Sequence, residues 1–316
     1  MSLFKIICSI ILLLTSLTVS AESIDQWLDK MSQAMKQQNF KGTLIIRQGD
    51  SLQAIEVRQG MSNGQSWQTL ESKTGEDQII FRKNGQVTTI FPSKKLVTIT
   101  EANKTGSAQQ TLHPVLPKNR DKLKKLYTLI LGAEARVANK ITQKISVIPR
   151  DKHRYGYTFW LDKQSGLLLK CDLISNKGRV IEQQMYSDIE LLASEPVNQI
   201  NEFEIAKYRK MRLSNTNDEN SKKWRAQQIP MGFVLKRSVK IALQKPTYHM
   251  VFSDGMASVS VFIETAREKK TSPVGRSHMG PVNAYSSFFD NTYVTAIGEV
   301  PPSTVQMIAQ SIRPVQ

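Results

Sequence analysis

Side chains able to do chemistry are few and scattered in this 316-residue sequence. Its four histidines are His113, His153, His249 and His278. None lies at a metal-ligand spacing from another histidine, a cysteine or an acidic residue, so a zinc site is not expected. The motifs of metalloproteases, serine hydrolases, phosphate-binding loops and dinucleotide-binding folds are all missing. We therefore expect no cofactor and no enzymatic activity, although carboxylates distant in the chain could still meet in the fold.

The two cysteines, Cys8 and Cys171, add little to this inventory. Cys8 lies in an N-terminal segment that we expect to be removed, so no intramolecular disulfide can form in the mature chain. Cys171 falls within a strand pattern, Leu167 to Ile174, where a free cysteine usually serves as a small buried apolar group. We expect its role to be structural and not reactive.

The N-terminus has the features of an export signal. Lys5 precedes an apolar run from Ile6 to Leu14, which is shorter than the roughly 20 residues that span a membrane. Val19-Ser20-Ala21 then places small side chains at a signal-peptidase site, so residues 1–21 are predicted to be a signal peptide cleaved after Ala21. An uncleaved anchor is the alternative. No second run of spanning length follows, and we expect an exported, soluble mature protein.

The formal charge of the whole chain is +16. Removal of residues 1–21 deletes only Lys5, which leaves 42 basic against 27 acidic residues, or +15. Such an excess favours anionic partners through long-range attraction. Because the export signal excludes nucleic acid as a partner, an acidic protein segment or an anionic lipid remains, and a basic surface kept for solubility is the alternative.

The first half of the mature chain combines one helix signal with many strand signals. A capping box at Ser23 and Gln26 predicts a helix that carries Trp27 on its apolar stripe. Alternating runs follow, joined by the turn pairs Gly49-Asp50 and Asn84-Gly85.

A second helix is predicted from Asp121 to Leu131, stopped by Gly132. Strand patterns then resume at 141–148, 155–161, 167–174 and 180–186. Together the strands predict a long antiparallel meander whose apolar face is available to helices or to a ligand.

The composition changes between Lys207 and Lys223, where periodicity and apolar residues are lost. We interpret 210–223 as a linker between a first domain at 22–209 and a second at 224–316. In the second domain Asp254-Gly255 predicts a tight hairpin. Its second arm alternates, with Ala257, Val259, Val261 and Ile263 on one face and Ser258, Ser260, Phe262 and Glu264 on the other. A final helix is predicted after Pro301-Pro302.

Three strings in the second domain resemble the RseB/MucB family of periplasmic regulators of the envelope-stress sigma factor (sigma-E). They are S-D-G-M-A-S-V-S-V-F-I-E at 253–264, M-G-P-V-N-A-Y at 279–285 and V-T-A-I-G-E-V-P-P at 294–302. The run Y-G-Y-T-F-W-L-D-K-Q-S-G-L-L-L-K at 155–170 resembles the N-terminal domain of the same family. The resemblance covers nearly the whole mature chain.

The resemblance implies a mixed α+β, β-rich fold. Its first domain is expected to be similar to the lipoprotein carriers LolA and LolB, a curved and incompletely closed antiparallel barrel with helices in its mouth. The second is expected to be a smaller α+β domain.

The resemblance also implies a function in the periplasm. Members bind the periplasmic region of a membrane-spanning anti-sigma factor of the RseA/MucA kind and shield it from regulated proteolysis. Lipopolysaccharide or another anionic lipid in the barrel is thought to release the complex. A periplasmic lipid or lipoprotein carrier, and an envelope enzyme, are the alternatives. The appended second domain favours the regulator, since a carrier needs only the barrel. Whether copies form a homo-oligomer stays open.

Aromatic residues supply the candidate contacts. For the protein partner we expect anchors in the second domain at Phe262 and Tyr285, because aromatic side chains often dominate interfaces. For the lipid we expect a concave lining of aromatic residues with cations at the strand ends to orient a phosphorylated headgroup. These residues are Trp67, Phe81, Phe91 and Trp160, with Arg82, Lys83, Lys94 and Lys95. In both sites the alternative is that the aromatic rings simply fill a core.

Overall fold

The computed structural model describes residues 22–101, 114, 116–117, 119–196, 205–213, 223–242, 246–265 and 274–315. The predicted signal peptide and His113 lie outside these ranges. Among the residues described, no helix is both long and apolar enough to cross a membrane.

The first helix, α2 (Ile24–Gln37), begins where the sequence predicts. The Ser23 hydroxyl accepts a hydrogen bond from the Gln26 backbone, and the Gln26 side chain accepts one from the Ser23 backbone. This reciprocal pair satisfies two amide groups that a helix start otherwise leaves without partners. The helix buries Trp27, Leu28 and neighbouring apolar residues against the sheet beneath it.

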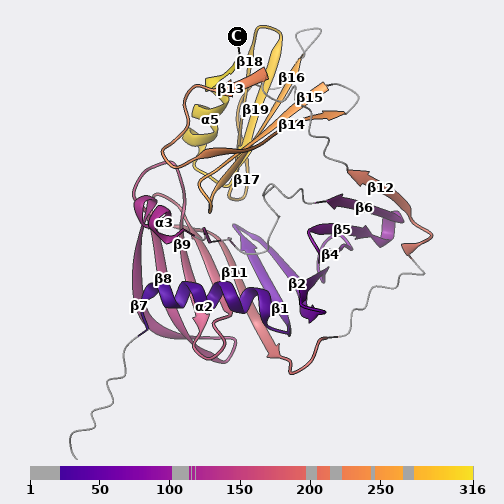
Figure 1. Cartoon of the computed structure of the whole chain (residues 1–316), viewed down its shortest axis with the longest axis vertical. Helices are drawn as coiled ribbons and strands as arrows, with labels where there is room; N and C mark the ends of the chain where they lie inside the picture. The colour runs from indigo at the N-terminus through magenta and orange to yellow at the C-terminus, as the bar shows by residue number, and fades with distance from the viewer. Residues whose placement is uncertain are drawn as a thin grey trace, which may run out of the picture.

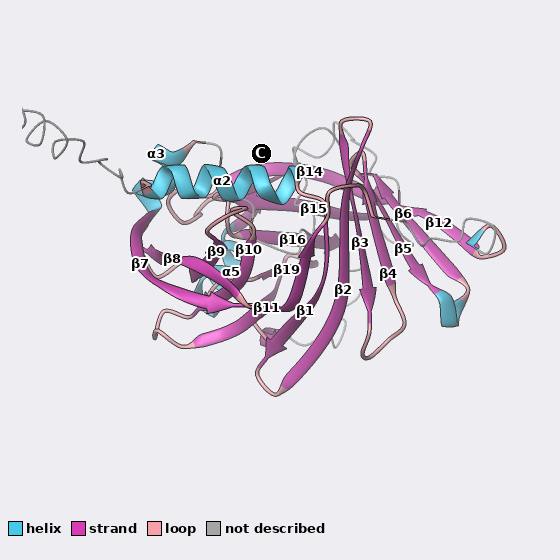
Figure 2. Cartoon of the chain, turned by 90° about the horizontal axis from the view of Figure 1, so that it is seen from below, coloured by secondary structure: helices cyan, strands magenta, loops and turns pink. Residues whose placement is uncertain are grey.

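The first domain is built on one strongly curved sheet of 12 strands, in the order β12-β6-β5-β4-β3-β2-β1-β11-β10-β9-β8-β7. The strands are β1 (Phe40–Gln48), β2 (Ser51–Ser62), β3 (Gln65–Ser72), β4 (Ile79–Lys83), β5 (Gln86–Phe91), β6 (Leu96–Glu101), β7 (Tyr127–Val137), β8 (Lys140–Pro149), β9 (Gly156–Asp162), β10 (Leu168–Ile174), β11 (Val180–Leu191) and β12 (Arg209–Leu213). The sheet does not close, and α2 lies across its concave side (Figures 1 and 2). This architecture confirms the expected fold class.

Two-residue turns fix the register of the first strands. Asn84 and Gly85 both have positive φ angles and join β4 to β5, as the sequence predicts. Asn63 and Gly64 do the same between β2 and β3.

The second predicted helix is wrong in its extent. Helix α3 spans only Arg120–Leu126, and the chain continues directly into β7 at Tyr127. The side chain of Asn119, not of Asp121, caps the helix by accepting the Lys122 backbone amide. The apolar residues that suggested a longer helix, Tyr127, Ile130 and Leu131, instead lie in β7, which pairs with β8.

The start of the predicted linker also differs from expectation. Residues 210–213 belong to β12, which pairs in parallel with β6 at the edge of an otherwise antiparallel sheet. Residues 214–222 lie outside the described ranges. Three of the five residues of β12 are basic, and Arg209 and Lys210 among them are exposed. Charged side chains on an edge strand commonly prevent it from pairing with the edge strand of another molecule.

The second domain is a six-stranded sheet in the order β14-β15-β16-β19-β18-β17, covered on one face by α5 (Pro302–Ser311) (Figure 1). Its strands are β14 (Val234–Ala242), β15 (Pro246–Ser253), β16 (Ser258–Thr265), β17 (Gly275–Met279), β18 (Val282–Phe289) and β19 (Thr292–Gly298). A small pair, β13 (Trp224–Ala226) and β20 (Ile312–Pro314), lies beside it. The predicted alternation of β16 is confirmed, because Val259, Val261 and Ile263 are all buried in the core.

The hairpin of β15 and β16 forms, but its turn is longer than a two-residue loop. Ser253 pairs with Ser258, so four residues make the turn. The Asp254 carboxylate accepts the backbone amides of Met256 at 2.8 Å and Ala257 at 2.7 Å. The aspartate thus organises the turn through its side chain, a role of this residue type in turns.

Candidate functional site

A cavity of about 480 Å³ opens between α2 and strands β3 to β5 on the concave side of the large sheet. Its lining is Met31, Ser32, Met35, Lys36, Gln59, Gln65, Ser66, Trp67, Gln68, Arg82, Lys83, Asn84, Gly85, Gln86, Val87, Pro114, Leu116 and Leu168. The two methionines and the leucines give it an apolar wall, and methionine adapts to varied shapes. Lys36, Arg82, Lys83 and several glutamine side chains also line it, so the cavity is amphipathic.

Arg82 is the central cation of this cavity. Its Nη1 donates to Gln68 Oε1 at 2.8 Å, while its buried Nε has no hydrogen-bond partner among the described residues. Burial lowers the pKa of the Arg82 guanidinium. Arg82 also lines a second cavity of about 240 Å³ farther along the concave face, beside Ile55, Leu70 and Ile80. Because the Arg82 guanidinium lies between two cavities and only some of its N–H groups are hydrogen-bonded to protein, it is suited to hold an anionic group.

Two of the predicted aromatic residues lie near this cavity. Trp67 is buried and contributes to the lining; its indole packs on Gly60, and its N–H donates to Glu195. Phe81 lies beside it, with ring centroids 6.2 Å apart, but does not line the cavity. A side chain at Gly60 would collide with the indole at about 2.7 Å, so glycine is required there.

The remaining predicted cations separate into two groups. Lys83 lines the cavity with Arg82. Lys94 and Lys95 do not; they are exposed near Phe91, where the Lys94 ammonium lies 5.3 Å from the Phe91 ring centroid and pairs with Glu76. Phe91 is also absent from the lining.

Trp160 lies on the face of the sheet that points away from α2. Its neighbours in β9, Phe159 and Leu161, pack in the core beneath the helix, and alternate residues of a strand point to opposite faces. The Trp160 ring is flanked by Lys144 and Lys170 from the two adjacent strands. It is partly buried and also packs against the hydrophobic cluster that includes Leu167 and Leu169.

The two predicted partner anchors lie on opposite faces of the second sheet. Phe262 is partly exposed on the face away from α5 and stacks on His249, with ring centroids 4.5 Å apart. Tyr285 packs against the core on the α5 side, and its hydroxyl accepts a hydrogen bond from Gln310. Phe262 also lines a shallow cavity of about 260 Å³ with Glu264, Ser286, Tyr293 and Thr295.

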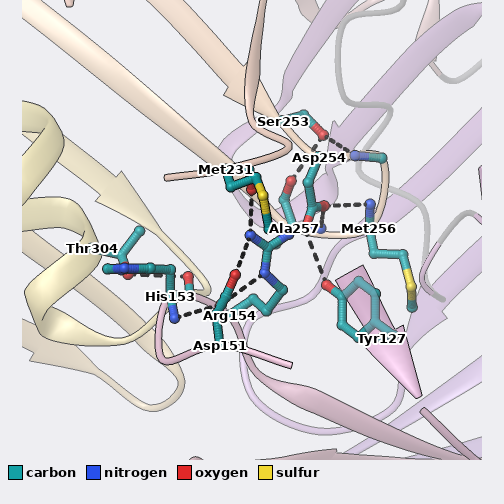
Figure 3. Close-up of polar contacts among 11 residues, drawn as sticks. Tyr127, Asp151, His153, Arg154, Met231, Ser253, Asp254, Met256, Ala257 and Thr304 are labelled. Atoms are coloured by element: carbon teal, nitrogen blue, oxygen red, sulfur yellow. Dashed lines mark hydrogen bonds and ion pairs between the residues drawn. The ribbon is translucent and has the colours of Figure 1, made fainter. Parts of the chain in front are cut away.

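A buried polar cluster joins the two domains (Figure 3). Arg154, which follows β8, is fully buried; its Nη1 donates to Asp254 Oδ2 at 2.5 Å and its Nη2 to the Met231 carbonyl at 2.6 Å. Asp151 takes two further hydrogen bonds from Arg154, through Nε and Nη2. Tyr127 donates its hydroxyl to the same Asp254 oxygen at 3.1 Å. All three guanidinium nitrogens are thus hydrogen-bonded, and Nη1 and Nη2 reach across the domain boundary.

The ionisation of this cluster follows from its burial. Burial, together with the nearby Asp254, raises the pKa of Tyr127 well above its ordinary value, so the phenol stays a donor. For Asp151, burial acts to raise the pKa of the carboxyl, but the hydrogen bonds from Arg154 and the His153 backbone, together with the charge of Arg154, outweigh it and lower this pKa. The arginine is therefore charged and paired on both sides.

Further contacts surround the cluster. Thr304 donates to the His153 carbonyl, and Asn283 donates to the Tyr155 hydroxyl in a buried position. Two glycines of the second domain meet the first domain closely, since a Cβ at Gly232 would lie 2.6 Å from Leu126 and one at Gly255 would lie 2.7 Å from Pro117. Both glycines also have positive φ angles. A side chain at either position is therefore disfavoured by the close contact and by the backbone conformation.

The sequence alone did not single out this interdomain cluster. The Asp254-Gly255 pair indicates only a turn, and Arg154 lies between two predicted strands with no role indicated by its neighbours. Nothing local distinguishes a buried arginine from an exposed one, and its partner is 100 residues away. The Asp151-Arg154 spacing is the single local signal, because residues three apart can pair.

Family models match nearly all of the chain. The model described as the MucB/RseB N-terminal domain matches residues 23–211, and that of the MucB/RseB C-terminal domain matches residues 218–313.

Individual relatives agree with these matches. The sigma factor AlgU regulatory protein MucB of Pseudomonas aeruginosa is 30% identical, with 97% of each chain covered. The sigma-E factor regulatory protein RseB of Haemophilus influenzae is 25% identical, with 96% of each chain covered. Among solved structures, the Pseudomonas aeruginosa MucA/MucB complex contains a chain that is 28% identical with a TM-score of 0.70, covering 92% of this chain and 98% of that one. MucB in complex with MucA(peri) gives 27% identity and a TM-score of 0.69, covering 93% and 100%.

Proposed function

The chain belongs to the MucB/RseB family, and on that premise we propose that it binds the periplasmic region of a membrane-spanning anti-sigma factor and thereby controls an envelope-stress sigma factor. The observation that carries this proposal is the likeness of both domains together to MucB, whose solved structures include complexes with MucA. Its relatives bear the names of sigma-factor regulatory proteins.

The predicted signal peptide at 1–21 supports export to the periplasm, where such a partner would be met. The mature charge of +15 favours an acidic partner segment, because opposite charge speeds encounter. Both anchor candidates are partly exposed, but Phe262 is the better placed, since it lines a shallow cavity on the face away from α5. Tyr285 instead packs against the core beneath α5, and its hydroxyl already accepts a hydrogen bond from Gln310. Residues of the exposed sheet face around Phe262 are therefore our proposed contact region.

The cavity under α2 is our proposed site for an anionic amphiphile such as lipopolysaccharide. Met31, Met35 and Leu168 offer an apolar wall to acyl chains, and Arg82 and Lys83 offer cations to a phosphorylated headgroup. The same cavity alone would suit a lipid carrier. The docked second domain favours a regulator, because a carrier has no use for a buried interdomain ion pair.

Lipid can release a partner only if it binds the released conformation more tightly. The structure offers a contiguous connection for such coupling. Leu116 lines the cavity, and the adjacent Pro117 abuts Gly255 in the β15–β16 turn, beside the Arg154–Asp254 pair. A ligand that displaces this segment would disturb the turn that precedes β16, the strand that carries Phe262.

Protection from proteolysis tests the proposed regulatory outcome. The periplasmic region of the anti-sigma factor is incubated with its site-directed protease, alone and with the mature chain. We expect the chain to slow the cleavage in a saturable manner and lipopolysaccharide fragments to restore it. Unchanged cleavage at saturating chain would contradict the shielding role, and persistent protection at saturating lipid would contradict the release.

A further inference from the structure

The face of the large sheet that points away from α2 carries an aromatic and basic surface at β7 to β10. We call it the outer patch and define it as Ile130, Lys144, Ile148, Trp160 and Lys170. Trp160 is paired with Lys144 across to β8 and with Lys170 across to β10, so the three side chains form one row. The proposed lipid cavity lies on the opposite face, under α2.

The row places two cations against one ring. The ammonium of Lys170 lies 4.2 Å and that of Lys144 lies 5.7 Å from the Trp160 ring centroid. The stem of Lys144 passes over Gly132 of β7, where a Cβ would come within 3.2 Å of it. The absence of a side chain at Gly132 therefore lets the lysine lie flat toward the indole.

The charge of the row is only partly neutralised. Lys144 forms no ion pair with any residue in the described part of the chain. Lys170 lies 3.6 Å from Asp172, whose carboxylate also accepts a hydrogen bond from Gln183. Within the described ranges, Lys144 thus has no carboxylate partner and Lys170 has only the long contact to Asp172, in a chain whose mature charge is already +15.

Apolar side chains extend the patch toward the sheet edge. Ile130 and Ile148 are each 46% exposed, which is unusual for isoleucine in a strand. Ile130 pairs with Ser146 and Ile148 pairs with Thr128, so both point to the same face as Lys144. The patch therefore combines two exposed aliphatic side chains with an indole and two lysines that are partly exposed, on the four adjacent strands β7 to β10.

We propose that the outer patch docks the protein on the surface of an anionic phospholipid bilayer. Tryptophan favours the boundary between headgroups and hydrocarbon, and lysine near an anionic membrane surface contributes favourable electrostatic energy. The two isoleucines would enter the apolar boundary while Lys144 and Lys170 meet lipid phosphates. Bilayer docking by this face would leave the cavity under α2 free for a separate ligand.

Flotation of the full mature chain with lipid vesicles tests this proposal. Vesicles of phosphatidylcholine alone are compared with vesicles that also contain phosphatidylglycerol. We expect binding only to the second kind. The double variant K144Q/K170Q should bind about 25-fold more weakly, because each lysine contributes roughly fivefold. The variant I130S/I148S should also lose binding, because the apolar contact is removed.

Matched variants separate the patch from charge in general and from the cavity. Lys122 and Lys125 are exposed on α3, outside the patch, so K122Q/K125Q removes the same charge and should retain vesicle binding. Arg82→Gln alters the cavity and should also retain it. Soluble glycerol phosphate should compete poorly with vesicles, since it offers a headgroup without a surface. Thermal unfolding of each variant identifies any that has lost its fold. In that case W160F is measured in its place, because it changes the Trp160 ring more mildly.

Three results would overturn the proposal. The first is equal vesicle binding by K144Q/K170Q and K122Q/K125Q. The second is loss of vesicle binding by R82Q alone, which would assign the lipid contact to the cavity. The third is self-association of the wild-type chain that I130S/I148S abolishes while vesicle binding persists, which would make the patch an interface between copies. Binding of the anti-sigma segment in lipid-free solution does not depend on the patch, so failure here leaves the proposed function standing.

Discussion

Arg154 of the first domain and Asp254 of the second form an ion pair in which both side chains are fully buried, with 2.5 Å between Nη1 and Oδ2. The aspartate accepts two backbone amides of its own turn through its other oxygen. The same side chain thus shapes the β15–β16 turn and fixes that turn to the first domain. A change in the distance between the domains must therefore break a desolvated pair, which makes the docked arrangement well defined.

Asp254→Asn removes the charge but leaves an oxygen for the turn amides. Because the Arg154 guanidinium would then be buried with only Asp151 as its counter-charge, we expect destabilisation of the docked state by about 3 kcal/mol. Urea unfolding followed by tryptophan fluorescence measures the change. The exposed Asp290 provides a matched control, and Asp290→Asn should change stability by less than about 0.5 kcal/mol.

The double variant R154M/D254N sharpens this test. If the two residues act through each other, the double variant should lose less stability than the sum of the two single variants. Strictly additive losses would show that the pair is not the interdomain contact we describe.

Arg82 is expected to determine the preference of the cavity for anionic amphiphiles. Arg82→Gln should weaken the binding of a phosphorylated lipid by about tenfold and leave a neutral single-chain detergent nearly unaffected, since a hydrogen-bonded charge contributes about 1.5 kcal/mol or more. Titration calorimetry on the mature chain measures both ligands. Lys95→Gln is the control, because Lys95 is exposed and away from the cavity lining. A similar loss in both variants would point to general charge and not to the cavity.

Local patterns allowed the sequence to predict much of the fold. The Ser23 capping box, the Asn84-Gly85 turn and the alternation of β16 each depend on residues within a few positions of one another, and each is present. The failure at α3 has the same origin, since Tyr127 to Leu131 is apolar enough for either a helix or a strand. Pairing with β8 decides the matter, and such pairing is invisible locally.

The candidate sites were less predictable for a related reason. Aromatic residues on strands were identified correctly as strand residues, but the side of the sheet depends on register and curvature. Trp67 reaches the cavity whereas Trp160 points to the opposite face. Successive residues of a strand point to opposite faces of the sheet. An error of one residue in the predicted register therefore places a surface residue in the cavity lining, or a lining residue on the surface.

Limited digestion with trypsin tests the linker. Arg209, Lys210 and Arg212 are held in β12 by pairing with β6, so we expect the first cut after Lys222 or Lys223 instead. The two fragments should elute together in gel filtration, because the Arg154–Asp254 cluster still joins them. First cuts within β12 or in the core strands would contradict the boundary. Separate elution of intact fragments would contradict a stable interdomain contact.

His249 should make the second domain sensitive to acid. Burial and the nearby Arg237 lower the pKa of His249 to about 4, from an ordinary value of 6.5. Between these values the unfolded chain binds a proton that the folded chain does not, so stability is lost as the pH falls from 6.5 toward 4. Allowing for partial exposure of the ring, the loss should reach about 2 kcal/mol.

Unfolding midpoints measured across this pH range check the effect of His249. The variant His249→Phe keeps a ring to stack on Phe262 and should flatten the acid dependence. The variant His278→Gln changes an exposed histidine and should leave it unchanged. If His249→Phe retains the full acid dependence, another group is responsible.

Fluorescence anisotropy of the labelled periplasmic region of the anti-sigma factor, titrated with the mature chain, tests the central proposal most directly. We predict saturable binding that Phe262→Ala weakens by about tenfold or more, as expected of an aromatic anchor, while Tyr285→Phe changes it little. Residues 224–316 alone should retain the partner. Absence of saturable binding by the folded wild-type chain would contradict regulation through an anti-sigma factor, and binding retained only by the first domain would contradict the assigned contact face.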